Sequence, residues 1–381
     1  MFDDIGALEL GAIYAMTRHR DDVLRDERLE QMQMQQEQRR VEAVATVEPV
    51  STPWGEGYPE PTNVEMVGDW GDFIGQDALK RTLMVYMTKA QELDEALPHV
   101  LLATGQPGVG KSTVAKLIAK SMGRQLYEVV PPFTVETLAG ILDEMWPKSF
   151  LFIDEIHRLA MGRSRSAEML LKVLEEGKLP LPDGTMLSLP PITVIGATTE
   201  PDLLPEPVLD RFKIKPAFTP YSIGELGQIA MHTAYKQGYD VGERLTSDLA
   251  ISMACACRGT PRILGEMVMG ADALFHVYGR PPTDAELFDF LQLEPDGLTR
   301  QHVAYLVTLY RHFGKRNPMG RVEYIAGEGA MQGLLRETKP GVNRLERYLQ
   351  ECGMLERTPK GRRLTDMGVL RVKTLIDEGK S

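Results

Sequence analysis

The stretch from residue 100 to residue 113, VLLATGQPGVGKST, constrains the fold more than any other part of the chain. Gly105, Gly110, Lys111 and Ser112 fill the pattern G-x-x-x-x-G-K-[ST]. The apolar run before the glycines predicts a β-strand, and TVAKLIAK after them has the apolar spacing of an α-helix. In this context the glycines let backbone N–H groups surround phosphate oxygens, and the helix N-terminus favours negative charge. The pattern therefore predicts a nucleotide site in an α/β domain.

The side chains of this loop predict how a nucleotide is bound. Lys111 can reach the β- and γ-phosphates of ATP, and the Ser112 hydroxyl can bind Mg²⁺. The loop residues that we expect to contact the nucleotide are Gly105, Pro107, Gly108, Val109, Gly110, Lys111, Ser112 and Thr113.

A second apolar run, FLFIDEIH at residues 150–157, ends in two adjacent carboxylates. Taken alone, it is equally consistent with a buried strand that runs into a solvated acidic turn. Ligands of open α/β sheets bind where strands end, so a phosphate-binding loop upstream changes the interpretation. We then expect Asp154 to complete the Mg²⁺ site and Glu155 to orient or activate the attacking water.

Composition and charge are those of a globular protein with one basic region. Hydrophobic residues make up 43% of the chain and charged residues 25%, and no apolar run is long enough to cross a membrane. The N-terminus lacks the basic start of a secretory signal, and the three cysteines form neither a disulfide framework nor a metal-ligand set, so we expect a cytoplasmic protein. The net charge of −11 argues against general nucleic-acid binding. However, residues 300–381 hold 16 basic and 9 acidic side chains, which indicates either a contact with a polyanion or a solvated basic surface.

The pattern along the chain predicts a tail and three domains. Residues 1–64 read as a flexible polar tail with a Pro/Gly linker, and 65–220 alternate strand and helix around a parallel sheet. Residues 221–295 read as a small helical domain. Residues 296–381 contain two amphipathic helices and then a strand, a Pro-Lys-Gly turn and a strand.

Three further side chains are placed to act on a phosphate. Thr199 follows Thr198 at the end of a buried strand, where a hydroxyl can sense the γ-phosphate or position water. Arg211 follows twelve residues later, and Arg262 opens a helix in the segment RGTPRILGE. An arginine delivered from a lid can pair with the γ-phosphate. Each arginine alone is better explained as a surface ion pair, and only the two together, in this order, favour a role at the nucleotide.

The chain resembles the RuvB family of AAA+ ATPases, the Holliday-junction branch-migration motors, over roughly residues 67–366. The stretches that carry the resemblance, in the family's order, are FIGQDALKRTL, GQPGVGKSTVAKLIAKSMG, LFIDEIHRL, PPITVIGATTEPDLLPEPVLDRF, RGTPRI and GMLERTPKGR. The resemblance implies an AAA+ P-loop domain with a parallel sheet, a helical lid domain and a C-terminal winged-helix domain.

The same resemblance implies roles for individual residues. Phe73 and Ile74 would sit against the adenine, with Tyr221 on the lid side. Thr199 matches sensor 1 and Arg262 sensor 2. Arg211 matches the arginine finger, which acts on ATP in a neighbouring subunit of a hexameric ring. The DNA-contacting wing would carry Arg357, Lys360, Arg362 and Arg363.

The sequence also departs from the family pattern. The N-terminal tail is extra, Leu209 stands where the family often has arginine, and the hairpin at about 178–189 is shorter and different in content. In the family this hairpin docks the partner RuvA, and here Leu179, Leu181, Met186 and Leu187 would form its exposed apolar arms. The alternative is that these side chains pack on their own domain.

The function that we expect is an ATP-driven translocase on duplex or junction DNA. The alternatives are an AAA+ loader that uses ATP as a switch and a DNA-binding scaffold with little turnover. Intact Lys111, Asp154, Glu155 and Arg211 argue against the scaffold.

Overall fold

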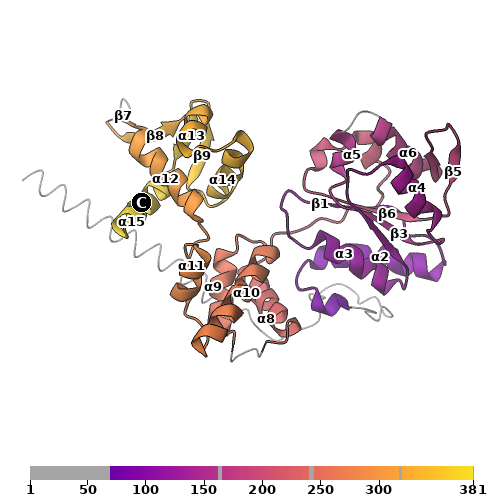
Figure 1. Ribbon diagram of the computed structural model, residues 1–381, viewed down its shortest axis with the longest axis horizontal. Coiled ribbons are helices and arrows are strands. Elements are labelled where there is room, and N and C mark those ends of the chain that lie inside the picture. Colours follow the sequence, from indigo (N-terminus) through magenta and orange to yellow (C-terminus); the bar gives the residue numbers. More distant parts are fainter. Residues whose placement is uncertain (1–68, 162–164, 240–243, 317–319, 381) are drawn as a thin grey trace, which may run out of the picture. The chain divides into compact units, whose positions relative to one another are not determined.

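The computed structural model describes residues 69–161, 165–239, 244–316 and 320–380 (Figure 1). The predicted N-terminal tail lies outside the described residues. In the part of the chain that is described, no helix is long and apolar enough to cross a membrane.

Four parallel strands form the sheet of the P-loop region, in the order β1-β6-β3-β2 (Figure 1). The three clear strand predictions, in HVLLAT, SFLFI and ITVIGAT, are confirmed. A two-stranded antiparallel hairpin, β4–β5, is the excursion predicted around Asp183-Gly184. The strands are β1 (Val100–Ala103), β2 (Leu126–Val129), β3 (Phe150–Ile153), β4 (Lys178–Pro180), β5 (Met186–Ser188) and β6 (Thr193–Thr198).

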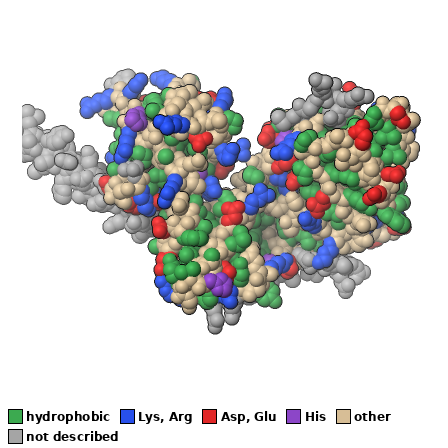
Figure 2. Space-filling model, in the orientation of Figure 1, with side chains coloured by type: hydrophobic (Ala, Val, Ile, Leu, Met, Phe, Trp, Pro, Cys, Tyr) green, Lys and Arg blue, Asp and Glu red, His purple; other side chains and the backbone are tan. Residues whose placement is uncertain are grey.

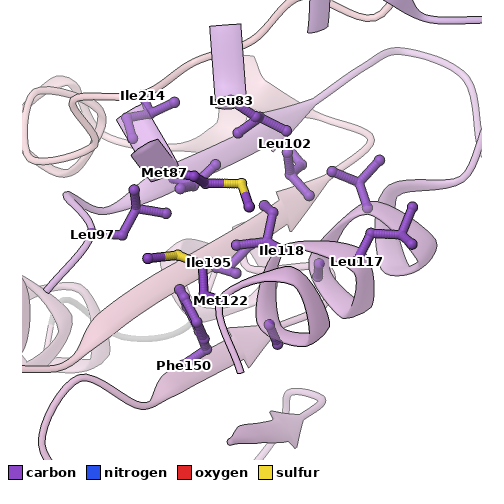
Figure 3. Close-up of a cluster of buried hydrophobic side chains, with 14 of the residues drawn as sticks. Leu83, Met87, Leu97, Leu102, Leu117, Ile118, Met122, Phe150, Ile195 and Ile214 are labelled. Carbon is purple, nitrogen blue, oxygen red and sulfur yellow. The ribbon is translucent and has the colours of Figure 1, made fainter. Parts of the chain in front are cut away.

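Helices cover both faces of this sheet, so its central strands are continuous apolar runs. Because side chains alternate along a strand, Leu102, Phe150 and Ile195 pack with helices α2 and α3 in one buried cluster (Figure 3). Leu151 and Val194 pack into a second cluster with α4 and α6. The helices are η1 (Asp69–Asp72), α2 (Asp77–Glu92), α3 (Lys111–Ser121), α4 (Val135–Asp143), α5 (His157–Met161), α6 (Arg165–Glu176), η2 (Pro201–Leu203) and α7 (Glu206–Leu209).

A group of helices with its own core follows, as the sequence predicts for the lid. Its first and last helices begin at capping boxes, in which Ser222 and Thr283 each accept the backbone N–H three residues on and the glutamate there bonds back. Cys257 is buried, which raises the pKa of its thiol to about 11, and it forms no disulfide. The helices are α8 (Ile223–Lys236), α9 (Ser247–Ala256), α10 (Pro261–Tyr278) and α11 (Asp284–Leu291).

The C-terminal region is a winged helix with a four-stranded antiparallel sheet, in the order β7-β8-β10-β9. The two predicted amphipathic helices and the strand–turn–strand are present. Sequence analysis missed the β7–β8 hairpin and α13, because short exposed strands carry almost no apolar alternation. The elements are α12 (Arg300–His312), β7 (Gly314–Arg316), β8 (Val322–Ala326), α13 (Glu328–Leu335), α14 (Lys339–Glu351), β9 (Leu355–Thr358), β10 (Gly361–Leu364) and α15 (Asp366–Asp377).

A buried carboxylate ties this sheet to the helices beneath it. Glu346 of α14 is 0% exposed and accepts hydrogen bonds from Tyr305 (3.0 Å), Arg362 Nε (2.8 Å) and Arg357 Nη2 (3.1 Å). Burial, and then the nearby charge of Glu346, raise the pKa of Tyr305, so its hydroxyl keeps the proton that it donates. Arg362 also pairs with Glu328 at 3.2 Å and its side chain is only 13% exposed. These contacts fix the wing strands against α12, α13 and α14.

We therefore expect Arg362→Ala to destabilise the winged helix, because Glu346 keeps its buried charge and loses a partner. The loss should be about 3 kcal/mol in the opening free energy of the β9–β10 amides, measured by native-state hydrogen exchange. Lys360→Ala, in the exposed turn of the same hairpin, is the control and should change it by less than about 0.5 kcal/mol. Equal protection in the two variants would show that the buried cluster does not stabilise the wing.

Candidate nucleotide-binding site

The glycine-rich loop connects β1 to α3, and its backbone favours glycine at two positions. Gly108 has φ 76° and Gly110 has φ 103°, in the left-handed region. A Cβ on Gly110 would lie 3.1 Å from the Phe73 ring, and one on Gly108 would lie 2.9 Å from the side chain of Arg262. The loop therefore sits closely between these two side chains, and α3 begins at Lys111 with its first N–H groups available for an anion.

A cavity of about 450 Å³ lies over this loop. Apart from Gly105, every residue that we predicted to bind ATP lines it, and so do Asp154 and Glu155. The predicted residues at the cavity are Phe73, Ile74, Pro107, Gly108, Val109, Gly110, Lys111, Ser112, Thr113, Tyr221 and Arg262.

The lid closes one side of the cavity through contacts with the loop. The Tyr221 hydroxyl donates to the Val109 carbonyl at 3.1 Å, and burial raises the pKa of Tyr221 to about 12. Lys236 of α8 pairs with Asp72 of η1 at 3.1 Å. Six further lining residues were not predicted from the sequence: Asp72, Ile229, His232, Thr233, Lys236 and Pro261. The contribution of the α8 residues follows only from the position of α8 beside η1.

Lys111 and the two acids meet because β1 and β3 end at the same edge of the sheet. Burial lowers the pKa of Lys111, while the charges of Glu155 and then Asp154 oppose that shift. Glu155 has φ 49°, and its N–H bonds the Asp154 carboxylate at 3.0 Å. The two adjacent carboxylates and Lys111 therefore face the same cavity, and a bound phosphate group can contact Lys111 there.

A small polar network holds the Glu155 carboxylate. The Thr199 hydroxyl donates to Glu155 Oε2 at 3.1 Å, and His157 Nδ1 lies 3.2 Å from the same oxygen. His157 Nδ1 also lies 3.0 Å from the Thr198 hydroxyl, and both side chains are buried. Sequence analysis missed His157 although it stands two residues after Glu155, because a lone histidine at the start of a helix gives no signal of its own.

The two candidate arginines differ in position. Arg262 lines the cavity. Arg211 is not among the lining residues and pairs with Glu175 of α6 at 2.8 Å. Of the two arginines, therefore, Arg262 lies at the nucleotide site of its own chain and Arg211 does not.

The wing residues predicted to contact DNA are mostly engaged with carboxylates. Arg357 and Arg362 bond the buried Glu346, and Arg363 bonds Glu356. Lys360 is exposed in the turn between β9 and β10, with no ion pair in the described part of the chain.

The hairpin at 178–189 is only partly the exposed excursion that the sequence predicts. Leu179 is fully buried, and Leu181 and Leu187 pack against the second core cluster, so the prediction of four exposed apolar arms is wrong for Leu179. β4 packs on α6, which explains this burial. Met186 is 41% exposed, and a cavity of about 490 Å³ lies between Leu181 and α6.

The chain matches known proteins over both of its main regions. Residues 68–218 match the family model of the Holliday junction DNA helicase RuvB P-loop domain, and residues 295–373 match the RuvB C-terminal winged helix domain.

Relatives with the same architecture cover most of the chain. The Holliday junction branch migration complex subunit RuvB of Leuconostoc mesenteroides is 33% identical over 311 residues, which span 78% of this chain and 84% of that protein. The Paramagnetospirillum magneticum protein of the same description is 33% identical over 310 residues, spanning 78% and 85%. The structure of the Thermotoga maritima RuvB Holliday junction branch migration motor superposes with a TM-score of 0.65 at 28% identity, covering 79% of this chain and 95% of that one. This chain therefore belongs to the RuvB family of Holliday junction branch-migration P-loop ATPases.

Proposed function

We propose that this RuvB-family chain hydrolyses ATP in the 450 Å³ cavity and uses the energy to move duplex DNA through branched junctions as a hexameric ring. The observation that carries the proposal is the convergence of Lys111, Ser112, Asp154, Glu155 and Arg262 on that one cavity. A chain that binds nucleotide without turnover has no need for an acid beside the metal-binding carboxylate. We also propose the domain division 65–220, 221–295 and 296–381, after a tail at 1–64.

The phosphates are bound by charge and by backbone. Lys111 sits at the helix N-terminus and lies buried between the loop and the acids, so its charge acts at low dielectric on the β- and γ-phosphates. Arg262 approaches from the lid and couples the lid to the γ-phosphate.

Mg²⁺ fits the oxygen donors at this site. Ser112 and Asp154 line the same cavity, and a hydroxyl and a carboxylate suit a hard cation that keeps waters and phosphate oxygens as its other ligands. In the described residues there is no cluster of three or more His, Cys, Asp or Glu that could hold a metal without the nucleotide. Bound there, Mg²⁺ neutralises charge on the β- and γ-phosphate oxygens.

Glu155 orients the attacking water and accepts its proton. Its Oε2 is held by Thr199 and lies beside His157, so these two positioning residues determine where the carboxylate points. We infer that a γ-phosphate oxygen competes for the Thr199 hydroxyl, which would release Glu155 toward the water.

Arg211 acts on the ATP of the neighbouring subunit. Two observations support this role: Arg211 is not among the residues that line the cavity of its own chain, and it is held on the surface of α6 by Glu175. Such a shared site requires an assembly of subunits, and a closed ring gives every site an arginine from its neighbour.

We expect Lys111→Ala to abolish tight nucleotide binding and Glu155→Gln to bind ATP but hydrolyse it poorly. The lysine supplies the charge that faces the phosphates, whereas the acid is needed only for the attack on water. Binding is measured with a fluorescent ATP analogue, turnover by phosphate release, and motor function by ATP-dependent conversion of a labelled four-way junction into duplex products.

Equal nucleotide affinity in Lys111→Ala and the parent would contradict the assignment of the site. Junction conversion that proceeds with a non-hydrolysable analogue would favour the loader, in which ATP is only a switch. Absence of turnover in the parent at saturating Mg²⁺, ATP and DNA would favour the scaffold.

We expect mixing of Arg211→Ala subunits with Glu155→Gln subunits to restore part of the turnover that each loses alone. Some mixed interfaces then pair an intact arginine with an intact acid, and an arginine finger contributes on the order of 10³–10⁵ in rate. The measurement is phosphate release across mixing ratios, with mixed assemblies verified by mass. No recovery at any ratio would rule out a site shared between subunits.

We expect Met186→Ser to weaken the response to a RuvA-like partner while basal ATP turnover is unchanged. Met186 is an exposed apolar side chain on the β4–β5 hairpin, and it pairs across the hairpin with Pro180, which lines a cavity that could receive a partner's side chain. Met367→Ser, a methionine with the same 41% exposure on α15, is the control. The measurement is partner-stimulated turnover, and an equal loss in the two variants would show that the effect is not specific to the hairpin.

A further inference from the structure

The β7–β8 hairpin at the edge of the winged-helix sheet carries exposed basic side chains on its first strand. Lys315 and Arg316 lie on β7 and are exposed, and Arg311 and His312 are exposed in the last turn of the preceding helix α12. Among the described residues, none of these four forms a salt bridge. Figure 2 shows Lys and Arg side chains gathered over the region where Figure 1 labels β7.

The β9–β10 wing on the other side of the same sheet differs from the β7–β8 hairpin because most of its basic side chains form ion pairs. Arg357 and Arg362 share a register position, so they point to the same face of the sheet, and there both bond the buried Glu346. Arg363 lies on the opposite face between Glu356 and Glu323, the latter at 3.8 Å. Three of its four cations are therefore committed to carboxylates within the protein, which leaves Lys360 as the wing's unpaired charge.

Among the described residues, Glu323 forms no ion pair with Lys315, although the two are cross-strand neighbours. Glu323 stands directly opposite Lys315, on the same face of the sheet. Its carboxylate lies toward Arg363, and there is no ion pair between Lys315 and Glu323 in the described residues. Arg316 pairs with Val322, an exposed apolar residue, so no acid lies opposite it either.

The hairpin is fixed to the body of the domain. The ring of Tyr324 on β8 stacks on Tyr310 of α12, with centroids 4.5 Å apart and planes 24° apart. A Cβ on Gly314 would lie 3.1 Å from the Tyr324 ring, so the strand passes close over this pair. A charged strand held in place binds a polyanion with less loss of conformational entropy than a mobile one.

We propose that the β7–β8 hairpin, through Lys315 and Arg316, is a main contact of this protein with the phosphate backbone of duplex DNA. The inference rests on the proposed motor function, which requires a grip on duplex DNA. Residues 1–299 hold 27 basic and 45 acidic side chains, so that part of the chain repels DNA as a whole and the grip must concentrate in the basic C-terminal region. Lysine and arginine side chains that contact only the phosphate backbone read no sequence, as a motor on arbitrary DNA requires.

The hairpin and the wing turn make separate contacts. β8 and β10 are antiparallel, and Arg362, at the start of β10, pairs with Ala326, at the end of β8. Lys360 therefore lies at the opposite end of the sheet from the β7–β8 turn. Removal of one contact should leave the other in place, so their contributions can be measured separately.

The test is the salt dependence of binding of the full-length protein to a fluorescein-labelled 30-base-pair duplex, with a non-hydrolysable ATP analogue present. Lys315→Ala with Arg316→Ala should flatten the slope of log affinity against log salt by about 2, because each lost phosphate contact removes about 0.9. Affinity at 0.1 M salt should fall by more than about tenfold. Lys360→Ala should flatten the slope by about 1.

Arg300→Ala with Lys373→Ala is the matched control, since it removes two exposed cations of the same domain that lie outside the sheet. It should keep the parent's slope, and all variants should keep the parent's affinity for the ATP analogue, which reports an intact fold. If the parent binds duplex DNA and the hairpin variant keeps its affinity and slope, or loses no more than the control, the hairpin inference is wrong. If the parent itself does not bind duplex DNA at any salt concentration, the proposed motor function fails, and the inference fails with it.

Discussion

The nucleotide site depends on one constraint, the parallel order β1-β6-β3 in the sheet. Parallel neighbours end at the same edge, so the loop after β1, the threonines after β6 and the acids after β3 meet although they are far apart in sequence. The order also explains the network at Glu155, because Thr199 and His157 follow adjacent strands. A different strand order would leave every sequence motif intact but would move the phosphate-binding loop, the acids and the threonines away from one another.

Charge in the winged helix divides into a structural and a functional part. Glu346 is fully buried, so its charge requires compensation, and two arginines of the wing supply it. The positive charges of these two arginines are balanced by Glu346 within the domain, so they contribute little to the binding of a ligand. The hairpin at the other edge of the sheet has no such buried acid, and its cations face solvent. The number of basic residues in a segment therefore says less about a polyanion site than the number that remain outside ion pairs.

We expect the lid to make the site sensitive to nucleotide. Tyr221 and Arg262 both come from the helical region and lie against the P-loop, where Gly108 leaves no room for a larger residue. A nucleotide that fills the cavity must fit between the lid and the loop. In a ring whose Arg211 reaches the next subunit, we expect this fit to couple the chemistry of one site to the position of its neighbour.

The sequence alone determined the local chemistry of this protein. The glycines around Lys111 predict a phosphate-binding loop because glycine adopts a left-handed backbone at no steric cost. The short apolar run before Asp154 predicts a buried strand, and the structure confirms it. Tertiary structure decided which side chains meet. It placed His157 beside Glu155 and buried Leu179, a residue of the hairpin that the sequence predicts to be exposed. It also paired Arg362 with Glu346, whereas Lys315 stays exposed. The physical reason is that a motif depends on backbone conformation within a few residues, whereas burial and ion pairing depend on partners from distant strands and helices, which only the fold brings together.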